Sequence, residues 1–163
     1  MKQPNRPNGF TIVELMLSLA ILVVLAALAV PMFGNNEALQ LDVTRRLLIS
    51  DLEYSQILAI TNPDDAIALV IDDAGNGWHI ATVANPSIPL NDSVTGNPLV
   101  TNLGQGAATS ASDVSIECNT ASNMIAFDQN GGLVDFTQVA EITLQINEVT
   151  SLIQISPMTG SIQ

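Results

Sequence analysis

A long apolar run near the N-terminus dominates the pattern of hydrophobic and polar positions. From Leu15 to Val30 the only polar residue is Ser18. Counted from Phe10, the run would form a helix of roughly 31 Å at about 1.5 Å per residue, enough to cross the hydrocarbon core of a bilayer. A helix that is apolar on every face needs lipid or other protein around it. The pattern therefore predicts a transmembrane or assembly helix over residues 10–33.

A proline interrupts the helical pattern, and an amphipathic helix follows it. Pro31 lacks an N–H and its ring clashes with the preceding turn, so we expect a kink or local melting over residues 31–36. Asn62-Pro63 ends the second helix, which we predict from Glu37 to Thr61 as part of a continuation over 34–62. Its apolar face consists of Leu41, Leu48, Leu52 and Ala59, widened by Ile49 and Ile60.

The remainder of the chain, residues 63–163, has the pattern of short β-strands. Asp72–Gly77 has the composition of a hairpin loop, and Gln129–Gly132 that of a turn. Runs of apolar and β-branched residues predict strands at 66–71, 78–84, 114–118, 124–127, 133–136, 141–146 and 151–156. A long helix followed by neighbouring strands predicts an α+β fold with an antiparallel sheet.

Residues 85–112 break this β pattern. They contain three prolines, several glycines and many Ser, Thr and Asn residues, with little periodicity. We interpret the segment as a long surface loop with at most one short strand, over residues 99–103. Loops of this length are uncommon and often bind partners or move.

The charge balance is strongly acidic. Sixteen Asp and Glu residues against four Lys and Arg residues give a net charge of -12 and an isoelectric point near 4.1. Such a surface repels phosphate backbones, so no nucleic-acid partner is expected. Arg45 and Arg46, in the second predicted helix, are either a contact within a filament or part of a solvated face. Asp42 precedes Arg46 by four positions, a favourable helical pair.

Candidate chemistry is sparse. One cysteine, Cys118, and one histidine, His79, exclude an internal disulfide and a Cys/His zinc cluster. Cys118 is interpreted as a small buried strand residue, with an intermolecular disulfide or a reactive thiol as the alternative. Trp78 and His79 are interpreted as a core and a surface residue of one strand.

The acidic pairs Asp64-Asp65 and Asp72-Asp73 raise the question of calcium binding. The loop that follows Asp72 lacks the alternating ligands and the closing Glu of a calcium-binding loop, so a solvated turn is favoured. No nucleophile elbow or phosphate-binding loop is present in the sequence. We therefore expect no catalytic residue, no metal site and no cofactor.

The N-terminal segment allows three interpretations, which differ in where the chain is cut. It is a secretory signal cut near Ala27–Ala29, an uncut anchor, or a leader cut after Gly9 that leaves the apolar helix attached. Glu14 separates them, because it is the only charged residue between Arg6 and Glu37. A carboxylate in an apolar membrane helix costs about 2–3 kcal/mol and needs a partner. A disposable signal or a plain anchor has no use for such a residue, which favours the third interpretation.

The residues at this point resemble a known family. Asn8-Gly9-Phe10-Thr11-Ile12-Val13-Glu14-Leu15 is similar to the type III leader of type IV pilins and of type II secretion pseudopilins. The resemblance implies that residues 1–9 are a prepilin leader, that a membrane peptidase cuts after Gly9, and that the new amino group of Phe10 is methylated. It also places Pro31 where many pilins carry a proline that loosens the helix.

The expected chemistry of Glu14 follows from its distance to Phe10. Cleavage before Phe10 would create a cationic amine at the membrane end of the helix, and Glu14 lies one helical turn away at i+4. In a bundle of such helices, the carboxylate of one subunit would meet the amine of a neighbour, and the pair would set the axial register of assembly. An interfacial, solvated Glu14 is the alternative.

A looser resemblance extends over most of the chain outside residues 85–112. It is to the GspH/FimT branch of minor pseudopilins and minor pilins, and implies a long helix packed on a small antiparallel β-sandwich. The segments that carry it are Leu47–Leu52, Ala59-Ile60, Gly77–Ile80, Ile125–Asp128 with Gly131 or Gly132, and Pro157–Gly160. DNA-binding members of this branch use basic residues near the C-terminus, and this sequence has none there.

The sequence thus predicts a structural filament subunit and not an enzyme. The resemblance implies a GspH-like minor pseudopilin of a type II secretion system, anchored once in the bacterial inner membrane with its globular domain in the periplasm. Its expected partners are other pilins or pseudopilins, the prepilin peptidase and methyltransferase, the inner-membrane assembly platform and an exported protein cargo. The alternatives are a FimT-like minor pilin of a type IV pilus or competence system, and a secreted binding domain with an ordinary signal.

Overall fold

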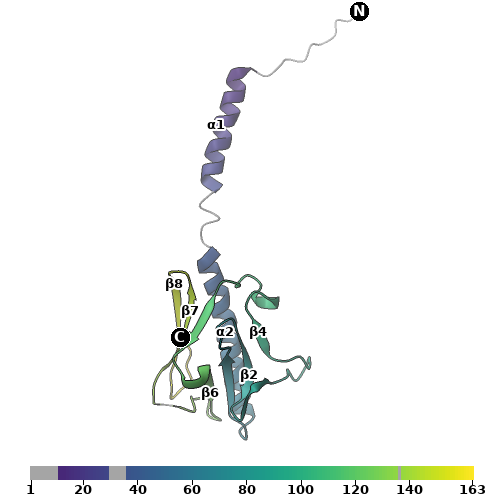
Figure 1. Ribbon diagram of the computed structural model, residues 1–163, viewed down its shortest axis with the longest axis vertical. Coiled ribbons are helices and arrows are strands. Elements are labelled where there is room, and N and C mark those ends of the chain that lie inside the picture. The colour runs from purple at the N-terminus through teal and green to yellow at the C-terminus, as the bar shows by residue number, and fades with distance from the viewer. Residues whose placement is uncertain (1–10, 30–35, 136) are drawn as a thin grey trace, which may run out of the picture. The chain divides into compact units, whose positions relative to one another are not determined.

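The computed structural model describes residues 11–29, 36–135 and 137–163, and the chain divides into two compact units, Met1–Asn36 and Glu37–Gln163 (Figure 1). In the first unit, helix α1 runs over Ile12–Ala29. The leader over residues 1–9, Phe10, and Pro31 with its expected kink lie outside the described residues. The predicted helix is therefore confirmed only over Ile12–Ala29.

Helix α2 (Asn36–Thr61) opens the second unit, and its predicted buried stripe is confirmed. Leu48 and Leu52 are fully buried, whereas Ile60, expected at the border of the apolar face, is half exposed at 50%. The stripe also contains two buried hydroxyls that the pattern did not predict. Thr44 Oγ1 donates to the carbonyl of Gln40 at 2.9 Å and Ser55 Oγ to that of Asp51 at 2.7 Å, so neither hydroxyl lacks a partner.

Two antiparallel sheets follow, which confirms the α+β class. The first contains β1 (Ile67–Ile71), β2 (Gly77–Thr82), β3 (Asn85–Pro89), β4 (Val100–Asn102) and β6 (Met124–Phe127). The strand order is β3-β2-β1-β6, and β4 also pairs with β2. Strand β4 pairs with Gly77–His79 of β2, and β3 pairs with Ala81 and Thr82 of the same strand, between which the register shifts.

The second sheet has the order β5-β7-β8. Its strands are β5 (Ser115–Cys118), β7 (Ala140–Ile146) and β8 (Val149–Ile155). Strands β7 and β8 form a hairpin whose turn contains Asn147 at a positive φ of 50°, a conformation that asparagine tolerates better than most residues. The alternation of Ile142, Leu144 and Ile146 toward the core is confirmed.

Glycine at position 75 brings the two sheets together. The loop between β1 and β2 turns at Gly75, whose φ is +66° and whose carbonyl accepts the N–H of Ile116 in β5 at 2.9 Å. A Cβ at this position would lie 2.6 Å from the Ile116 carbonyl oxygen. Only glycine combines this backbone angle with so close an approach.

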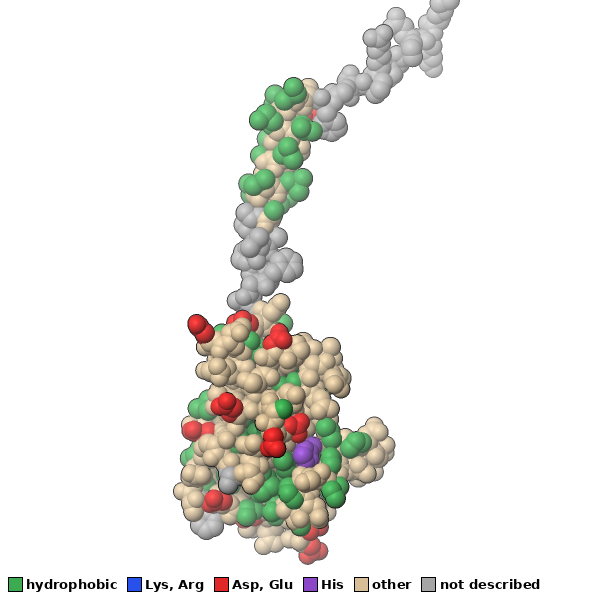
Figure 2. Space-filling model, in the orientation of Figure 1, with side chains coloured by type: hydrophobic (Ala, Val, Ile, Leu, Met, Phe, Trp, Pro, Cys, Tyr) green, Lys and Arg blue, Asp and Glu red, His purple; other side chains and the backbone are tan. Residues whose placement is uncertain are grey.

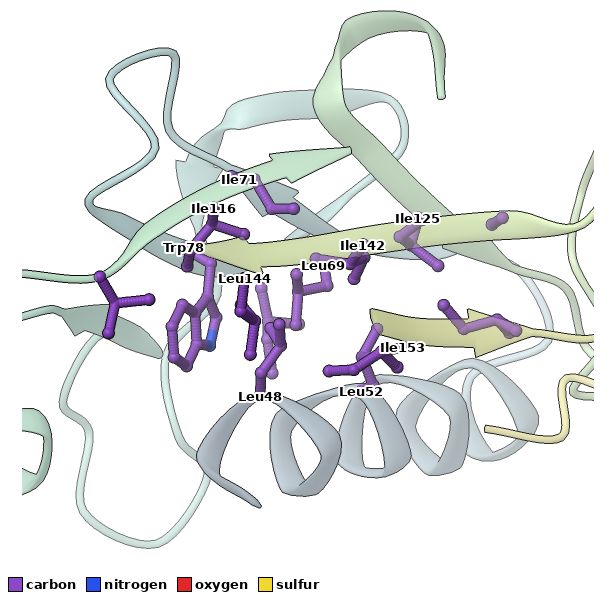
Figure 3. Close-up of a cluster of buried hydrophobic side chains, with 14 of the residues drawn as sticks. Leu48, Leu52, Leu69, Ile71, Trp78, Ile116, Ile125, Ile142, Leu144 and Ile153 are labelled. Carbon is purple, nitrogen blue, oxygen red and sulfur yellow. The ribbon is translucent and has the colours of Figure 1, made fainter. Parts of the chain in front are cut away.

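The core fills the space between α2 and both sheets (Figure 3). Leu48 and Leu52 rise from the helix toward Leu144 and Ile153 of the second sheet, while Leu69 of the first sheet lies beside them. The helix therefore supplies one wall of a core that belongs to both sheets.

Two of the predicted elements need correction. Residues 85–112 are not a single loop, because β3, which was not predicted, lies within them and Asn91 bridges Pro98. The one short strand that was expected over residues 99–103 is present as β4. A short 3-10 helix, η2 (Gly106–Ala108), follows; a second, η3 (Ala121–Asn123), precedes β6. The predicted strand 133–136 is wrong for the residues described: Leu133 makes an isolated bridge to Phe127 and donates its N–H to the carbonyl of Pro157 at 2.8 Å, which directs the chain toward the C-terminal segment.

Candidate assembly site

Glu14 lies in the first turn of α1. Thr11, just before the helix, caps this turn: its Oγ1 accepts the N–H of Glu14 at 3.3 Å and its carbonyl accepts that of Leu15 at 3.1 Å. A carboxylate in the first turn also interacts favourably with the positive end of the helix dipole. The Glu14 side chain is exposed, so its oxygens are available to a cation outside the helix. Gly9 and Phe10 lie outside the described residues.

Apart from Thr11 and Ser18, the side chains around Glu14 are apolar, and they are exposed. Figure 2 shows hydrophobic side chains on the visible surface of the described part of α1. Ile12 is 79% exposed and Val13 76% exposed. Within residues 11–29, 36–135 and 137–163, the helices fall short of the combined length and apolarity that a membrane crossing requires. An exposed apolar surface of this extent is typical of a surface that contacts a partner.

The face of α2 opposite the core carries the two arginines of the globular unit. Arg46 pairs with Asp42 one turn earlier, with 2.9 Å between Nε and Oδ2. The predicted i,i+4 pair is thus confirmed, although an exposed pair of this kind adds little stability. Arg45 is half-buried at the border of the same face.

Sequence analysis missed a polar cluster of the globular unit that is centred on Asp51. Trp78 is buried, as expected, but its Nε1 donates to Oδ2 of Asp51 on α2 at 2.7 Å. The same oxygen accepts the hydroxyl of Thr101 in β4 at 3.1 Å. One carboxylate therefore ties α2 to β2 and β4. Asp51 stands next to Leu52 on the edge of the apolar stripe. This position was the only feature of the sequence that could have indicated a buried contact for Asp51.

The remaining titratable residues do not converge on one point. His79 Nε2 lies 2.7 Å from the carbonyl oxygen of Pro86, and its Nδ1 lies 3.8 Å from Oδ1 of Asp72. Among the described residues, no three His, Cys, Asp or Glu side chains are grouped so that they could hold a metal ion. Cys118 is half-buried, and its Sγ lies 3.0 Å from the hydroxyl of Thr120.

Two exposed aspartates are held by local hydrogen bonds. The backbone N–H and the hydroxyl of Thr95, with the N–H of Val94, lower the pKa of Asp92 below its ordinary value. The hydroxyl and N–H of Thr137 lower the pKa of Asp135 in the same way. Hydrogen bonds of this kind favour the charged carboxylate. Both groups fix turns on the surface, and neither belongs to a larger constellation.

Comparison with known proteins identifies a family motif in the N-terminal residues. The family described as the prokaryotic N-terminal methylation motif matches residues 4–30. This match and the helix followed by an antiparallel sheet domain are consistent with a type IV pilin-like protein. Its fold is similar to that of the type IV minor pilin FimU of Pseudomonas aeruginosa, with a TM-score of 0.59 and 21% identity over 78% of this chain and 89% of that one.

A second crystal form of the same FimU agrees. It has a TM-score of 0.53 and 21% identity, and covers 72% of this chain and 86% of that chain. No curated protein matches the sequence. The similarity to FimU concerns the fold alone. The methylation motif is the finding that concerns the chemistry of the N-terminal residues.

Proposed function

We propose that this protein is a structural minor subunit of a type IV pilus-like filament, anchored in the bacterial inner membrane through its N-terminal helix until it is assembled. The observation that carries the proposal is the methylation motif over residues 4–30, because it predicts a chain that keeps its apolar helix after processing. Gly9 is the proposed cleavage residue, and Phe10 is the proposed N-methylated N-terminus. The uncovered apolar surface of α1 supports the same proposal.

Glu14 is the proposed register residue. In this mechanism its carboxylate, exposed in the first turn of α1, pairs with the amine of Phe10 on an adjacent subunit. Each group compensates for the desolvation of the other as the helices gather. Pro31 is proposed to loosen the chain between the membrane part and the globular domain. The prepilin peptidase, the methyltransferase, the assembly platform and other pilins are the proposed partners.

Between the possible systems, we favour a minor pilin of a type IV pilus over a GspH-like pseudopilin of type II secretion. The similarity of the globular fold to FimU supports this preference. The pseudopilin remains the second candidate because both systems share the leader that Gly9, Phe10 and Glu14 resemble. Exported cargo as a partner belongs to that second candidate.

Mass spectrometry of the mature N-terminus tests the proposal. The expected result is a chain that begins at Phe10 with one added methyl group and remains in the membrane fraction. A Gly9→Val variant should retain residues 1–9, whereas an Asn8→Ala control should be processed. Recovery of a mature chain that begins near Val30, free of the membrane, would contradict the proposal.

A further inference from the structure

The outer face of α2, opposite the buried stripe, is uncovered along the helix. Leu39, Arg46, Glu53 and Ile60 recur along it every seven residues. All four are exposed, and Leu39 and Ile60 keep 60% and 50% of their area in solvent. A seven-residue spacing keeps side chains on one side of a helix and is the spacing of helix-to-helix seams. We name these four residues the α2 seam.

The two central residues of the α2 seam have opposite charge. Arg46 and Glu53 are two turns apart, about 10.5 Å along the axis. Arg46 has its Nε on Asp42, yet 78% of its side chain remains exposed, so further guanidinium donors are available. Ser50 lies between the two levels, is exposed, and is small enough to admit another helix at the usual separation of about 8–10 Å.

Arg46 is important because the rest of the globular unit is strongly acidic. Residues 37–163 contain fifteen carboxylates, and Arg45 and Arg46 are their only Lys or Arg residues. Figure 2 shows several acidic side chains on the visible face of the unit. Two such units repel each other over most of their surfaces. The α2 seam is the place where one copy offers a cation to another.

We propose that the α2 seam packs against the α2 seam of a second copy of this chain, with the two helices parallel and displaced by two turns. Arg46 of one copy then lies beside Glu53 of the other. At the same displacement, Arg46 of the other copy lies over Leu39, and Ile60 of the other copy lies over Glu53. The aliphatic stems of both charged side chains therefore cover the exposed apolar residues.

The parallel direction rests on the proposed function, since equivalent subunits of one filament share the same orientation and their α2 helices therefore run the same way. An undisplaced parallel pair would set Arg46 against Arg46 and Glu53 against Glu53, which like charges disfavour. An antiparallel pair would match Arg46 with Glu53 twice, but it needs copies of opposite orientation. The displaced parallel pair is the arrangement that satisfies both the charges and the common orientation of the subunits.

Cysteine cross-linking of the full chain in membranes tests the displacement. In a Cys118→Ser background, one copy carries Val43→Cys and a co-expressed copy carries Ser50→Cys, because positions seven residues apart face each other in the proposed pair. The expected result is a covalent dimer of the two different variants, at least about fivefold more abundant than that of either variant alone. A dimer that forms as readily from Ser50→Cys alone, or no dimer at all, overturns the proposal.

Charge exchange tests the contact itself. Arg46→Glu should lower the mixed dimer about fivefold, and the double variant Arg46→Glu with Glu53→Arg should restore it to within about twofold. Arg45→Glu, with the same charge change on the border of the face, and Glu117→Arg on β5 are matched controls that should leave the dimer unchanged. An Arg45→Glu loss as large as that of Arg46→Glu, or no rescue in the double variant, overturns the proposal.

The N-terminal mass of each variant separates the two proposals. A chain that begins at methylated Phe10 but gives no mixed dimer overturns the α2 contact and leaves the proposed function standing. A chain with another N-terminus overturns the proposed function, and with it the reason for a parallel pair.

Discussion

Asp51 shows how much one carboxylate can hold together in this domain. Its Oδ2 accepts hydrogen bonds from Trp78 Nε1 and from the hydroxyl of Thr101, so its loss leaves a donor on a tryptophan that is 1% exposed without a partner. Asp51→Ala should lower the free energy of unfolding by about 2–3 kcal/mol. Thermal unfolding of the full chain in micelles, followed by the fluorescence of Trp78, the only tryptophan, measures this loss.

The matched control is Glu53→Ala on the same helix. Glu53 is exposed, so this variant should stay within about 0.5 kcal/mol of the wild type. Equal stability of the Asp51 and Glu53 variants would mean that the bond to Trp78 contributes nothing.

At Asp92 the relevant variable is pH. Because the hydrogen bonds from Thr95 and Val94 lower the pKa of Asp92 in the folded chain, they stabilise the turn fully above the ordinary aspartate pKa. That contribution is lost as the pH falls through the lowered value. Following the Thr95 amide resonance by NMR between about pH 5 and pH 2 should give a midpoint below the ordinary aspartate value. A midpoint at or above that value would contradict the role of these hydrogen bonds.

At the scale of elements, α2 is the part on which the core depends most. Leu48 is fully buried where the helix meets both sheets (Figure 3). Leu48→Ala should therefore lower the free energy of unfolding by about 3 kcal/mol, from lost apolar burial and the cavity left behind. Leu39→Ala, on the 60% exposed side of the same helix, should change it by less than about 0.5 kcal/mol. Thermal unfolding of both variants measures the two changes in free energy, and similar values would contradict the role of the buried stripe.

Sequence patterns predicted those elements whose local and tertiary preferences agree. The spacing of Leu41, Leu48, Leu52 and Ala59 defined α2, and the alternation along β7 defined its buried side. Strand β3 was missed because it is a short outer strand, mostly exposed, and is held by pairing with β2 rather than by a pattern of its own. Strand β4 is equally short, and it lies within the one short strand that was expected over residues 99–103. The opposite error occurred at Leu133, where an apolar run predicted a strand that is not present. The backbone N–H of Leu133 instead donates to the carbonyl of Pro157.

The same distinction applies to the candidate site. The methylation motif lies in consecutive residues, so Gly9, Phe10 and Glu14 could be proposed as site residues without any structure. The cluster of Asp51, Trp78 and Thr101 joins residues 27 and 50 positions apart in sequence, and only the folded chain brings them together. The α2 seam lies between these cases, since its spacing is local but its exposure depends on what the rest of the domain leaves uncovered.

For the whole molecule, the proposed assembly depends on the single charge of α1. In the described part of that helix, Glu14 is the one ionisable side chain, and its neighbours Ile12 and Val13 are more than three-quarters exposed. Gathering such helices removes the carboxylate from water, which is costly unless a cation accompanies it. Glu14→Ala should therefore leave cleavage and methylation of Phe10 largely intact and lower incorporation into filaments at least about tenfold.

Sheared filaments and the N-terminal mass of the membrane-bound pool measure these two effects separately. Glu14→Asp keeps the charge on a shorter side chain and should recover part of the incorporation. Glu14→Gln should not, because the amide keeps the shape but has no negative charge with which to form an ion pair with an ammonium ion. Ser18→Ala, one turn further along α1, is the control for a change of polarity without a change of charge. Incorporation of Glu14→Gln at the wild-type level would show that a hydrogen-bonding side chain suffices and that no ion pair sets the register.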